Sequence, residues 1–446
     1  MIHWFKDQHL RSLLKNSSYL GVSKAIGGVC GIATLAFAAR GLGVVLFGTL
    51  ILISSYVKAV SGIAKFQSWQ LIVRYGGHGV AHGEPEDFKV VTGFAFALDL
   101  ISGFGGMLIG AALLPFIGAW SGIHHEYLWM SVIYCTLIPT MASATPTGVL
   151  RALDRFDLIS WGGTAQPISR AVLAAIAYLT DAPFAAYVAV WYVTELFDDL
   201  LLWFLAWREL RRTGHLQGIR PTLKPAGLPG AWRFAIHVNL TSSIDAVWGP
   251  IGRLAVGGLL GAAGAGLFRL ASELADGAQK PADLLARAFY PEVVRMDLST
   301  KKPWKLMLRS SVLIGGVALF AIVVLLVGGK PLIGLLFGRD FLGAYGPLII
   351  LMAVPLMGVF GFALVPMLYA LGRSGAPLKA KALGSIIFFL AIAPLSWTFG
   401  VAGAAIALVL GNVTNVVTMM IQLRREYGRV RRRSGQTPSR DNARPA

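Results

Sequence analysis

Residues 382–423 read ALGSIIFFLAIAPLSWTFGVAGAAIALVLGNVTNVVTMMIQL, a run of 42 residues without a charged side chain. A helix needs about 20 apolar residues to cross the hydrocarbon core of a bilayer, so this stretch is long enough for two spans. Three other long stretches, residues 127–150, 310–329 and 341–372, are also free of charge. The sequence therefore predicts a helical protein that crosses the membrane many times.

The composition of the whole 446-residue chain agrees with this prediction. Only 14% of the residues are charged, whereas a soluble domain carries roughly 25%. Apolar runs between polar breaks define twelve predicted spans: 16–38, 45–66, 91–118, 127–148, 164–180, 184–205, 233–257, 263–290, 310–328, 344–370, 382–399 and 402–423. We predict an all-α membrane protein with about twelve transmembrane helices in two pseudo-symmetric six-helix bundles.

The distribution of basic residues predicts the orientation. If the N-terminus is cytoplasmic, the segments on that side carry 28 Lys and Arg, and the opposite loops carry three. Basic residues concentrate in cytoplasmic loops. The net charge of +18 is then mainly a topology signal, with some attraction to anionic lipid, and no nucleic-acid partner is expected. We predict a bacterial inner (cytoplasmic) membrane location with both termini in the cytoplasm.

The longest basic linker falls near the middle of the chain, with six predicted spans on each side. The expected divisions are a cytoplasmic N-terminal segment (1–15), an N-terminal six-helix bundle (16–205), a basic cytoplasmic linker (206–232), a C-terminal six-helix bundle (233–423) and a disordered basic cytoplasmic tail (424–446).

The two halves share a weak internal repeat. Each opens with a polar turn that contains an asparagine, Asn16 or Asn239. Each then reaches a Leu-Gly pair, Leu42-Gly43 or Leu260-Gly261, which is followed by an aromatic residue. Internal repeats of this kind are typical of transporters built from two related bundles.

Charged residues inside predicted spans are candidates for function, because each costs several kcal/mol against lipid and must face a cavity or a partner. In the predicted span 263–290, six charges recur every three or four residues and so share one helical face. They are Arg269, Glu273, Asp276, Lys280, Asp283 and Arg287. This face either lines a wet cavity or pairs with itself at i,i+4 spacing, as Arg269 can with Glu273.

Cations in other spans extend the candidate site. Lys and Arg can replace the hydration shell of a pyrophosphate in a partly dehydrated cavity, and Arg does so with bidentate geometry. For Lys65 and Arg40, which lie near span ends, snorkelling to the headgroups is the alternative. The predicted anion-binding residues are Lys24, Arg40, Lys58, Lys65, Arg253, Arg269, Lys280 and Arg287.

Carboxylates away from span ends are candidates for coupling to H⁺ or Na⁺, because a buried carboxylate can bind and release a proton near neutral pH. For Asp245, a salt bridge to Arg253 is the alternative. The acidic cluster Glu195, Asp198 and Asp199 either couples to an ion or neutralises a basic neighbour. No catalytic group, metal site or cofactor is predicted. The coupling candidates are Asp99, Asp245, Glu273 and Asp276.

Several fragments, taken in order, resemble a known family. They are Leu14-Lys15-Asn16-Ser17, Ala39-Arg40-Gly41-Leu42-Gly43, Leu46-Phe47-Gly48, Gly257-Gly258-Leu259-Leu260-Gly261, Gly264 to Ala271, Phe289-Tyr290-Pro291 and Leu335 to Phe341. Their order, spacing and twelve-span frame resemble the Wzx-type polysaccharide flippases of the multidrug/oligosaccharidyl-lipid/polysaccharide (MOP) exporter superfamily. The resemblance implies a V-shaped pair of six-helix bundles that works by alternating access. It implies as cargo an undecaprenyl-pyrophosphate-linked oligosaccharide for O-antigen, capsule or exopolysaccharide.

The sequence thus predicts a non-enzymatic flippase for lipopolysaccharide, capsule or exopolysaccharide synthesis. Its expected partners are the polyprenyl-pyrophosphate-linked oligosaccharide, the lipid bilayer, a polysaccharide polymerase and a chain-length regulator. One alternative is a cation-coupled multidrug exporter, although span 16–38 carries Lys24 and lacks the carboxylate that many drug-exporting relatives use. Another is a membrane polysaccharide polymerase or glycosyltransferase, although the longest predicted outer loop, 329–343, is short for a catalytic domain. A peptidoglycan-precursor flippase is the third.

Overall fold

The computed structural model describes residues 8–77, 86–294, 302–371, 373 and 375–435, apart from some side chains within these ranges. All regular structure in this part of the chain is helical. In chain order the elements are α1 (Gln8–Ala64), α2 (Ser68–Leu71), η2 (Ile72–Gly76), α4 (Glu86–Trp120), η3 (His125–Tyr127), α5 (Leu128–Cys135), α6 (Ile138–Met141), α7 (Thr145–Ala152), α8 (Phe156–Leu179), α9 (Phe184–Arg212), α10 (Ala231–Ala246), η4 (Val247–Ile251), α11 (Gly252–Val294), α12 (Lys302–Leu336), η5 (Arg339–Ala344), α13 (Tyr345–Leu351), α14 (Ala353–Gly361), α15 (Leu364–Ala370), α16 (Gly375–Phe399) and α17 (Val401–Gly435).

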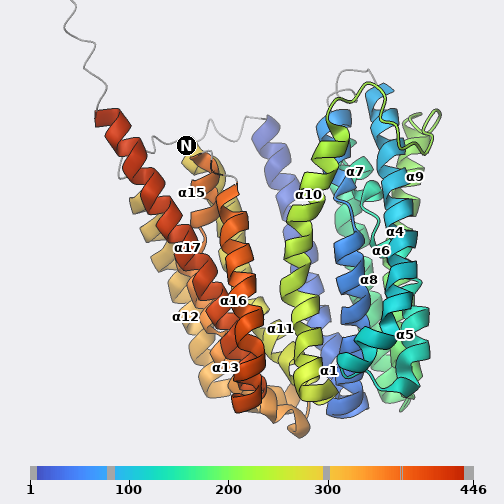
Figure 1. Ribbon diagram of the computed structural model, residues 1–446, viewed down its shortest axis with the longest axis vertical. Helices are drawn as coiled ribbons and strands as arrows, with labels where there is room; N and C mark the ends of the chain where they lie inside the picture. Colours follow the sequence, from blue (N-terminus) through green and yellow to red (C-terminus); the bar gives the residue numbers. More distant parts are fainter. Residues whose placement is uncertain (1–7, 78–85, 295–301, 372, 374, 436–446) are drawn as a thin grey trace, which may run out of the picture. The chain divides into compact units, whose positions relative to one another are not determined.

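The all-α membrane fold predicted from the sequence is confirmed (Figure 1). Two predicted spans are not continuous helices, because 127–148 is divided among η3, α5, α6 and α7, and 344–370 among η5, α13, α14 and α15. Among the described residues, six helical stretches are long and apolar enough to cross a membrane. A seventh results if the bent pair His125–Cys135 and Ile138–Ala152 forms one span. Helix α9 is not among them, because carboxylates interrupt its apolar surface.

One glycine breaks each of the long helices α1 and α11, and the two glycines have the same conformation. Gly43 has φ 67° and ψ 177°, and Gly261 has φ 73° and ψ −178°. Only glycine adopts this region readily, because it has no Cβ. These are the glycines that the internal repeat aligns. Two helical limbs of α1 therefore meet at Gly43 with no loop between them.

We expect alanine at position 43 to lower the free energy of unfolding by about 1–3 kcal/mol, the cost of a side chain in this backbone region. A Cβ at Gly43 would meet no atom within 4 Å, so the effect is conformational and not steric. Gly31 has equally open surroundings within the regular helix of the first limb. Gly31→Ala is therefore the matched control and should be neutral or slightly stabilising. Thermal unfolding in detergent measures both variants, and equal losses would contradict the special role of Gly43.

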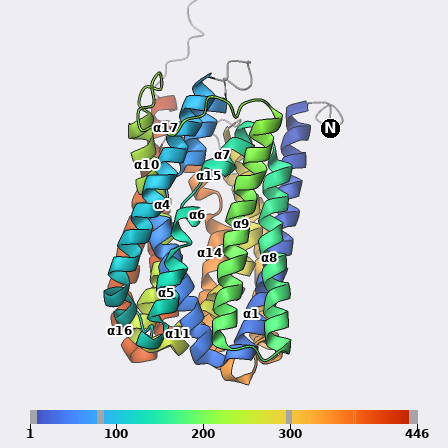
Figure 2. The same cartoon turned by 90° about the vertical axis from the view of Figure 1, so that its right-hand side faces the viewer.

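The chain divides into two compact units. Unit 1 comprises Met1–Gly266 with Leu336–Asp340, and unit 2 comprises Leu267–Leu335 with Phe341–Ala446. In unit 1, α8 packs against both α1 and α9 (Figure 2). In unit 2, α16 and α17 pack side by side and form a core with α15. The uncharged run 382–423 thus forms a helical hairpin.

Parts of the predicted cytoplasmic segments extend these helices. Helix α1 already begins at Gln8, and α9 continues to Arg212 within the predicted linker. Helix α17 continues to Gly435, so residues 424–435 of the predicted tail are helical. Residues 1–7 and 436–446 lie outside the described part of the chain.

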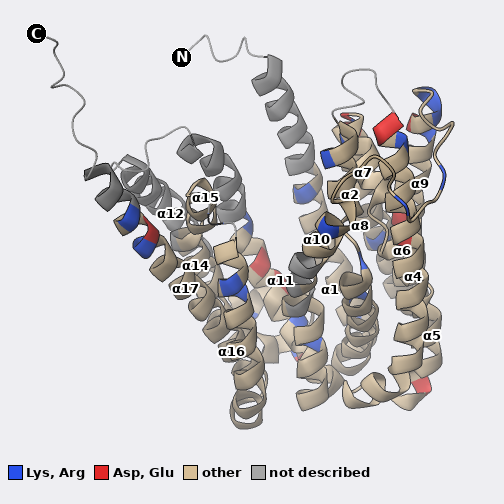
Figure 3. Ribbon diagram, turned by 45° about the horizontal axis from the view of Figure 1, so that its top comes forward, with Lys and Arg blue, Asp and Glu red and all other residues tan. Residues whose placement is uncertain are grey.

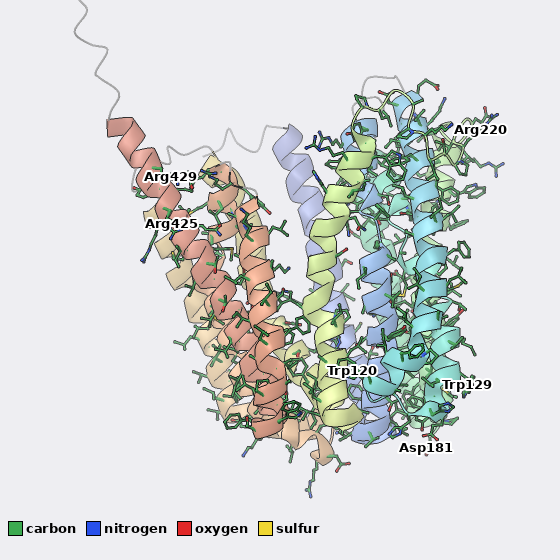
Figure 4. All side chains as sticks on the ribbon, viewed as in Figure 1. Trp120, Trp129, Asp181, Arg220, Arg425 and Arg429 are labelled. Carbon is green, nitrogen blue, oxygen red and sulfur yellow. The ribbon has the colours of Figure 1, made fainter. Side chains whose placement is uncertain are left out.

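The surface of the helices carries large apolar side chains, as expected for contact with lipid. Phe116 is 75% exposed, and Val327 is 81% exposed. Trp120 and Trp129, which are both exposed, lie at the same end of unit 1 as Asp181, and Arg220 lies at the opposite end (Figure 4). Exposed tryptophans at one end of a helix bundle are typical of the membrane interface.

Candidate functional site

Three helices of unit 1 bring charged and polar side chains together within the predicted spans. We call this group the Glu195 cluster: Lys58 of α1, Gln166 and Arg170 of α8, and Glu195 of α9. The carboxylate of Glu195 lies 2.5 Å from Arg170 and 3.4 Å from the ammonium of Lys58. The amide of Gln166 donates a third contact of 3.3 Å. Of the two sequence interpretations, Glu195 therefore neutralises basic neighbours.

The two cations of the cluster are held differently. Arg170 also donates to the hydroxyl of Thr194 at 2.8 Å, and its guanidinium lies 5.5 Å from the ring centre of Trp191. Its side chain is 12% exposed, whereas that of Lys58 is 35% exposed. Arg170 is thus the fixed counter-ion of Glu195, and Lys58 is the more accessible cation.

A second set of polar contacts joins the second limb of α1 to α10 and α11. The guanidinium of Arg253 donates to the hydroxyl of Ser55 at 2.8 Å. The amide of Asn239 donates to the carbonyl of Lys65 at 2.9 Å. Ser55 and Lys58 are three residues apart on a helix and so occupy neighbouring positions on one face. Arg253 of α11 therefore contacts α1 one turn before Lys58, and both are predicted anion-binding residues.

The other predicted cations of unit 1 are Lys24, Arg40 and Lys65. The ammonium of Lys65 donates to the carbonyl of Met141 at 3.1 Å. Arg40 is exposed and donates to the carbonyl of Leu336 at 3.0 Å. Lys24 is exposed on the first limb of α1. The contacts of Lys65 and Arg40 thus join these residues to the ends of α6 and α12.

In unit 2, the predicted charged face of α11 is partly self-paired. Arg269 and Glu273 form an ion pair of 2.5 Å at i,i+4 spacing, which is one of the two arrangements that the sequence allowed. Asp276 and Lys280, one and two turns further on, are exposed. The side chains of Arg287, Asp283 and Asp245 lie outside the described part of the structure.

Asp99 of α4 is buried, and four donors occupy its carboxylate. Ser68 donates to Oδ1 at 2.7 Å, and Ser143 donates to Oδ2 at 3.1 Å. The backbone amides of Ala144 and Thr145 each donate to Oδ2 at 2.8 Å. These bonds attach α2 and the start of α7 to α4. The suggested role of Asp99 in ion coupling stays a prediction.

Sequence reasoning selected neither Arg170 nor Gln166, and it noted the neighbouring Asp198 and Asp199 without including them in the site. In the structure, one carboxylate oxygen of Asp198 and one of Asp199 are buried without a hydrogen-bond partner. The signal for Arg170 was present, because a lone Arg in one apolar span needs a partner and the next span carries the acidic cluster. Across the described residues, no group of three His, Cys, Asp or Glu side chains is arranged to hold a metal ion.

A separate ion network closes the loop end of unit 1, outside the predicted spans. The buried carboxylate of Glu209 contacts Arg155 at 2.7 Å and Arg212 at 2.6 Å. Burial alone would raise the pKa of Glu209, but the hydrogen bonds from Arg212 and Arg155 outweigh burial and lower it. The hydrogen bond from Arg155 likewise lowers the pKa of Asp157. The carboxylates of Glu209 and Asp157 are therefore charged at neutral pH.

Comparisons with known proteins define the class. No protein-family model matches the chain. An inward-facing multidrug resistance transporter of the MATE family, from the MOP superfamily, has a TM-score of 0.74 at 14% identity and covers 91% of this chain and 96% of its own. The lipid II flippase MurJ, in an inward closed conformation, has a TM-score of 0.66 at 12% identity and covers 93% of this chain and 90% of its own. The protein therefore has the fold of the MOP-superfamily transporters and flippases, as predicted.

A sequence relative is more specific. Inner membrane protein YghQ of Escherichia coli (strain K12) is 40% identical over 345 residues, which are 77% of this chain and 97% of YghQ. The chain belongs to the YghQ family. The finer resemblance to Wzx-type flippases stays a prediction.

Proposed function

We propose that the protein is a flippase that moves a polyprenyl-pyrophosphate-linked oligosaccharide from the cytoplasmic to the outer leaflet by alternating access. Its product would supply lipopolysaccharide, capsule or exopolysaccharide synthesis. The observation that carries this proposal is that Arg253 of α11 contacts α1 at Ser55, one turn before Lys58. A pyrophosphate is a compact dianion, and Lys and Arg together supply charge and bidentate hydrogen bonds to it.

The Glu195 cluster supports a mechanism of ligand exchange. Without cargo, Glu195 balances both Lys58 and Arg170. When the diphosphate arrives, Lys58 exchanges Glu195 for a phosphate oxygen. Glu195 keeps Arg170, so the exchange leaves no buried carboxylate without a counter-ion, which would be costly. The polyprenyl tail stays in lipid, and the change of partner alters the contact between α1 and α9.

Ion coupling would use buried carboxylates next to this cluster. Asp198 and Asp199 each present a buried oxygen without a hydrogen-bond partner in the described structure. We propose that these oxygens take up H⁺ or Na⁺ during the cycle, and that consumption of the glycan on the far side helps to set direction. The basic segments face the cytoplasm in this scheme, together with both termini.

The second candidate is a cation-coupled multidrug exporter, and the similarity to a MATE transporter favours it. At 14% identity this similarity concerns the fold alone. A cationic drug needs an accessible carboxylate, whereas Glu195 is already shared by two cations. An enzymatic role as polymerase or glycosyltransferase has less support, because the solved structures of this fold are described as transporters and flippases.

Reconstitution in proteoliposomes tests the proposal. The probe is a polyprenyl-pyrophosphate that carries a short fluorescent oligosaccharide, and a membrane-impermeant quencher reports how much of it lies in the outer leaflet. The matching monophosphate lipid is the control for headgroup charge, and ethidium tests drug export. We expect transbilayer movement of the pyrophosphate lipid to exceed that of the monophosphate lipid and of protein-free vesicles. Ethidium transport without movement of the glycolipid would overturn the flippase in favour of the exporter.

A further inference from the structure

Unit 2 has a basic pocket at the charged ends of its last helices, and none of the residues that line it is among the proposed transport residues. The pocket has a volume of about 360 Å³ and lies between the start of α16 and the end of α17. Figure 3 shows the charged residues of α17 gathered toward its C-terminal end, and Figure 4 labels Arg425 and Arg429 there. The polar residues that line the pocket are Arg373, Lys379, Gln422, Arg425, Glu426 and Arg429.

The pocket holds more positive than negative charge. Glu426 forms ion pairs with Arg373 at 3.0 Å and with Arg429 at 2.7 Å. These contacts fix two guanidinium groups at the pocket wall. Within the part of the chain that the structure describes, Lys379 and Arg425 are in no ion pair and are exposed. Four cations around one carboxylate leave an excess positive charge for an anion.

Two further groups face the pocket. Helix α16 begins at Gly375, and both Gly375 and Ala376 line the pocket, so the positive end of a long helix dipole adds to the field. Gln422 also lines the pocket, and its Oε1 is buried without a hydrogen-bond partner. An acceptor in this position would take a hydrogen bond from a ligand hydroxyl. The ligand therefore combines an anion with a hydroxyl group.

The position of the pocket along the helices indicates where that ligand resides. The uncharged run 382–423 forms the adjoining hairpin, and the pocket residues of α16 and α17 flank its two ends. They are therefore at the level where an apolar span meets the headgroups. Basic pockets between helices at this level bind anionic lipid headgroups.

We propose that this pocket binds the headgroup of phosphatidylglycerol. The phosphodiester lies against Arg425, Lys379 and the start of α16, and a glycerol hydroxyl donates to Gln422. A pocket of similar size in unit 1 is lined by Arg155, Arg208, Glu209, Arg211 and Arg212. It presents an unpartnered carboxylate oxygen of Glu209 instead of an amide, so the same preference is not expected there.

Lipid-dependent thermal unfolding of the purified full chain tests the proposal. Phosphatidylglycerol is titrated against phosphatidylcholine in detergent, and native mass spectrometry counts the retained lipid. Removing one cationic charge near a headgroup should weaken binding about fivefold, so Arg425→Gln is the first variant. Arg424→Gln is its matched control, because Arg424 is the preceding residue on α17, is also exposed and does not line the pocket. The control should bind phosphatidylglycerol as the wild type does.

Gln422→Leu separates recognition of the hydroxyl from recognition of charge. Phosphatidylethanol has the same phosphodiester without a hydroxyl on its headgroup. We expect the wild type to prefer phosphatidylglycerol over phosphatidylethanol and Gln422→Leu to lose that preference. Equal weakening by Arg424→Gln and Arg425→Gln would overturn the pocket as the site. Equal stabilisation by glycerol phosphate or inorganic phosphate would overturn a lipid as its ligand. Neither outcome depends on whether the protein is a flippase.

Discussion

Replacing Glu195 by leucine should destabilise the protein by about 3–5 kcal/mol, the cost of removing one partner from a buried ion pair. The substitution leaves Lys58 and Arg170 without their shared carboxylate, and Arg170 is only 12% exposed. Thermal unfolding in detergent and the yield of folded protein in the membrane measure the loss. Glu86, whose side chain is 81% exposed and pairs with Lys89, is the matched control. Its replacement by leucine should cost less than about 1 kcal/mol.

A compensated variant distinguishes the charge effect from packing. When Lys58 and Arg170 are replaced by methionine together with Glu195→Leu, the buried charges disappear and an apolar cluster takes their place. Replacement of a whole buried ion group by apolar residues is often neutral or stabilising. We therefore expect the triple variant to recover most of the lost stability. A triple variant as unstable as Glu195→Leu would show that the ion pairs are not the cause.

Neutralising Lys58 of α1 or Arg253 of α11 should have the second large effect. A hydrogen bond to a charged group contributes about 1.5–3 kcal/mol, so Lys58→Met and Arg253→Met should each slow lipid movement by about 10- to 100-fold. Lys58→Met leaves Glu195 paired with Arg170, so the protein should stay folded in the membrane. Loss of surface glycan in cells and of flipping in proteoliposomes measure the effect.

The control for this experiment is Lys89→Met, which removes a partly buried cation of α4 that pairs with the exposed Glu86. It should leave transport unchanged. Because Arg269 is also a predicted anion-binding residue, neutralising it should likewise abolish transport, which tests the charged face of α11 separately. Full activity of both Lys58→Met and Arg253→Met would remove these residues from the cargo site.

The fold could be predicted from the sequence because a bilayer imposes a one-dimensional rule. A span is usually a continuous apolar helix of about 20 residues, so a long uncharged run such as 382–423 can be recognised as membrane-spanning from the sequence alone. The glycine repeat could be found for a similar reason. A backbone conformation that only glycine adopts readily requires a glycine at that one position of the sequence. The Leu-Gly pairs of the internal repeat align Gly43 with Gly261, and the structure gives the two glycines the same φ and ψ within about 6°.

The site could be predicted only where partners lie on one helix. Arg269 and Glu273 are one helical turn apart, and this i,i+4 spacing allows the ion pair that the structure contains. Arg170 and Glu195 lie on different helices, and spacing along the chain does not show which helices pack together. The surroundings of Asp99 could not be predicted either, because two of its four donors are backbone amides, which every residue except proline has and which no sequence pattern reveals.

The joint at Gly43 has a consequence for how the first two spans can move. Spans joined by a loop can shift independently, since the loop absorbs the difference. A joint of one residue cannot absorb a relative displacement of the helices that it connects. A twist or tilt of one limb of α1 is therefore transmitted to the other limb. Lys58 lies on the second limb. A movement of this limb when Lys58 changes its partner would therefore also move the first limb. Extra residues inserted beside Gly43 would decouple the limbs, whereas the same insertion in the linker 206–232 would leave that transmission intact.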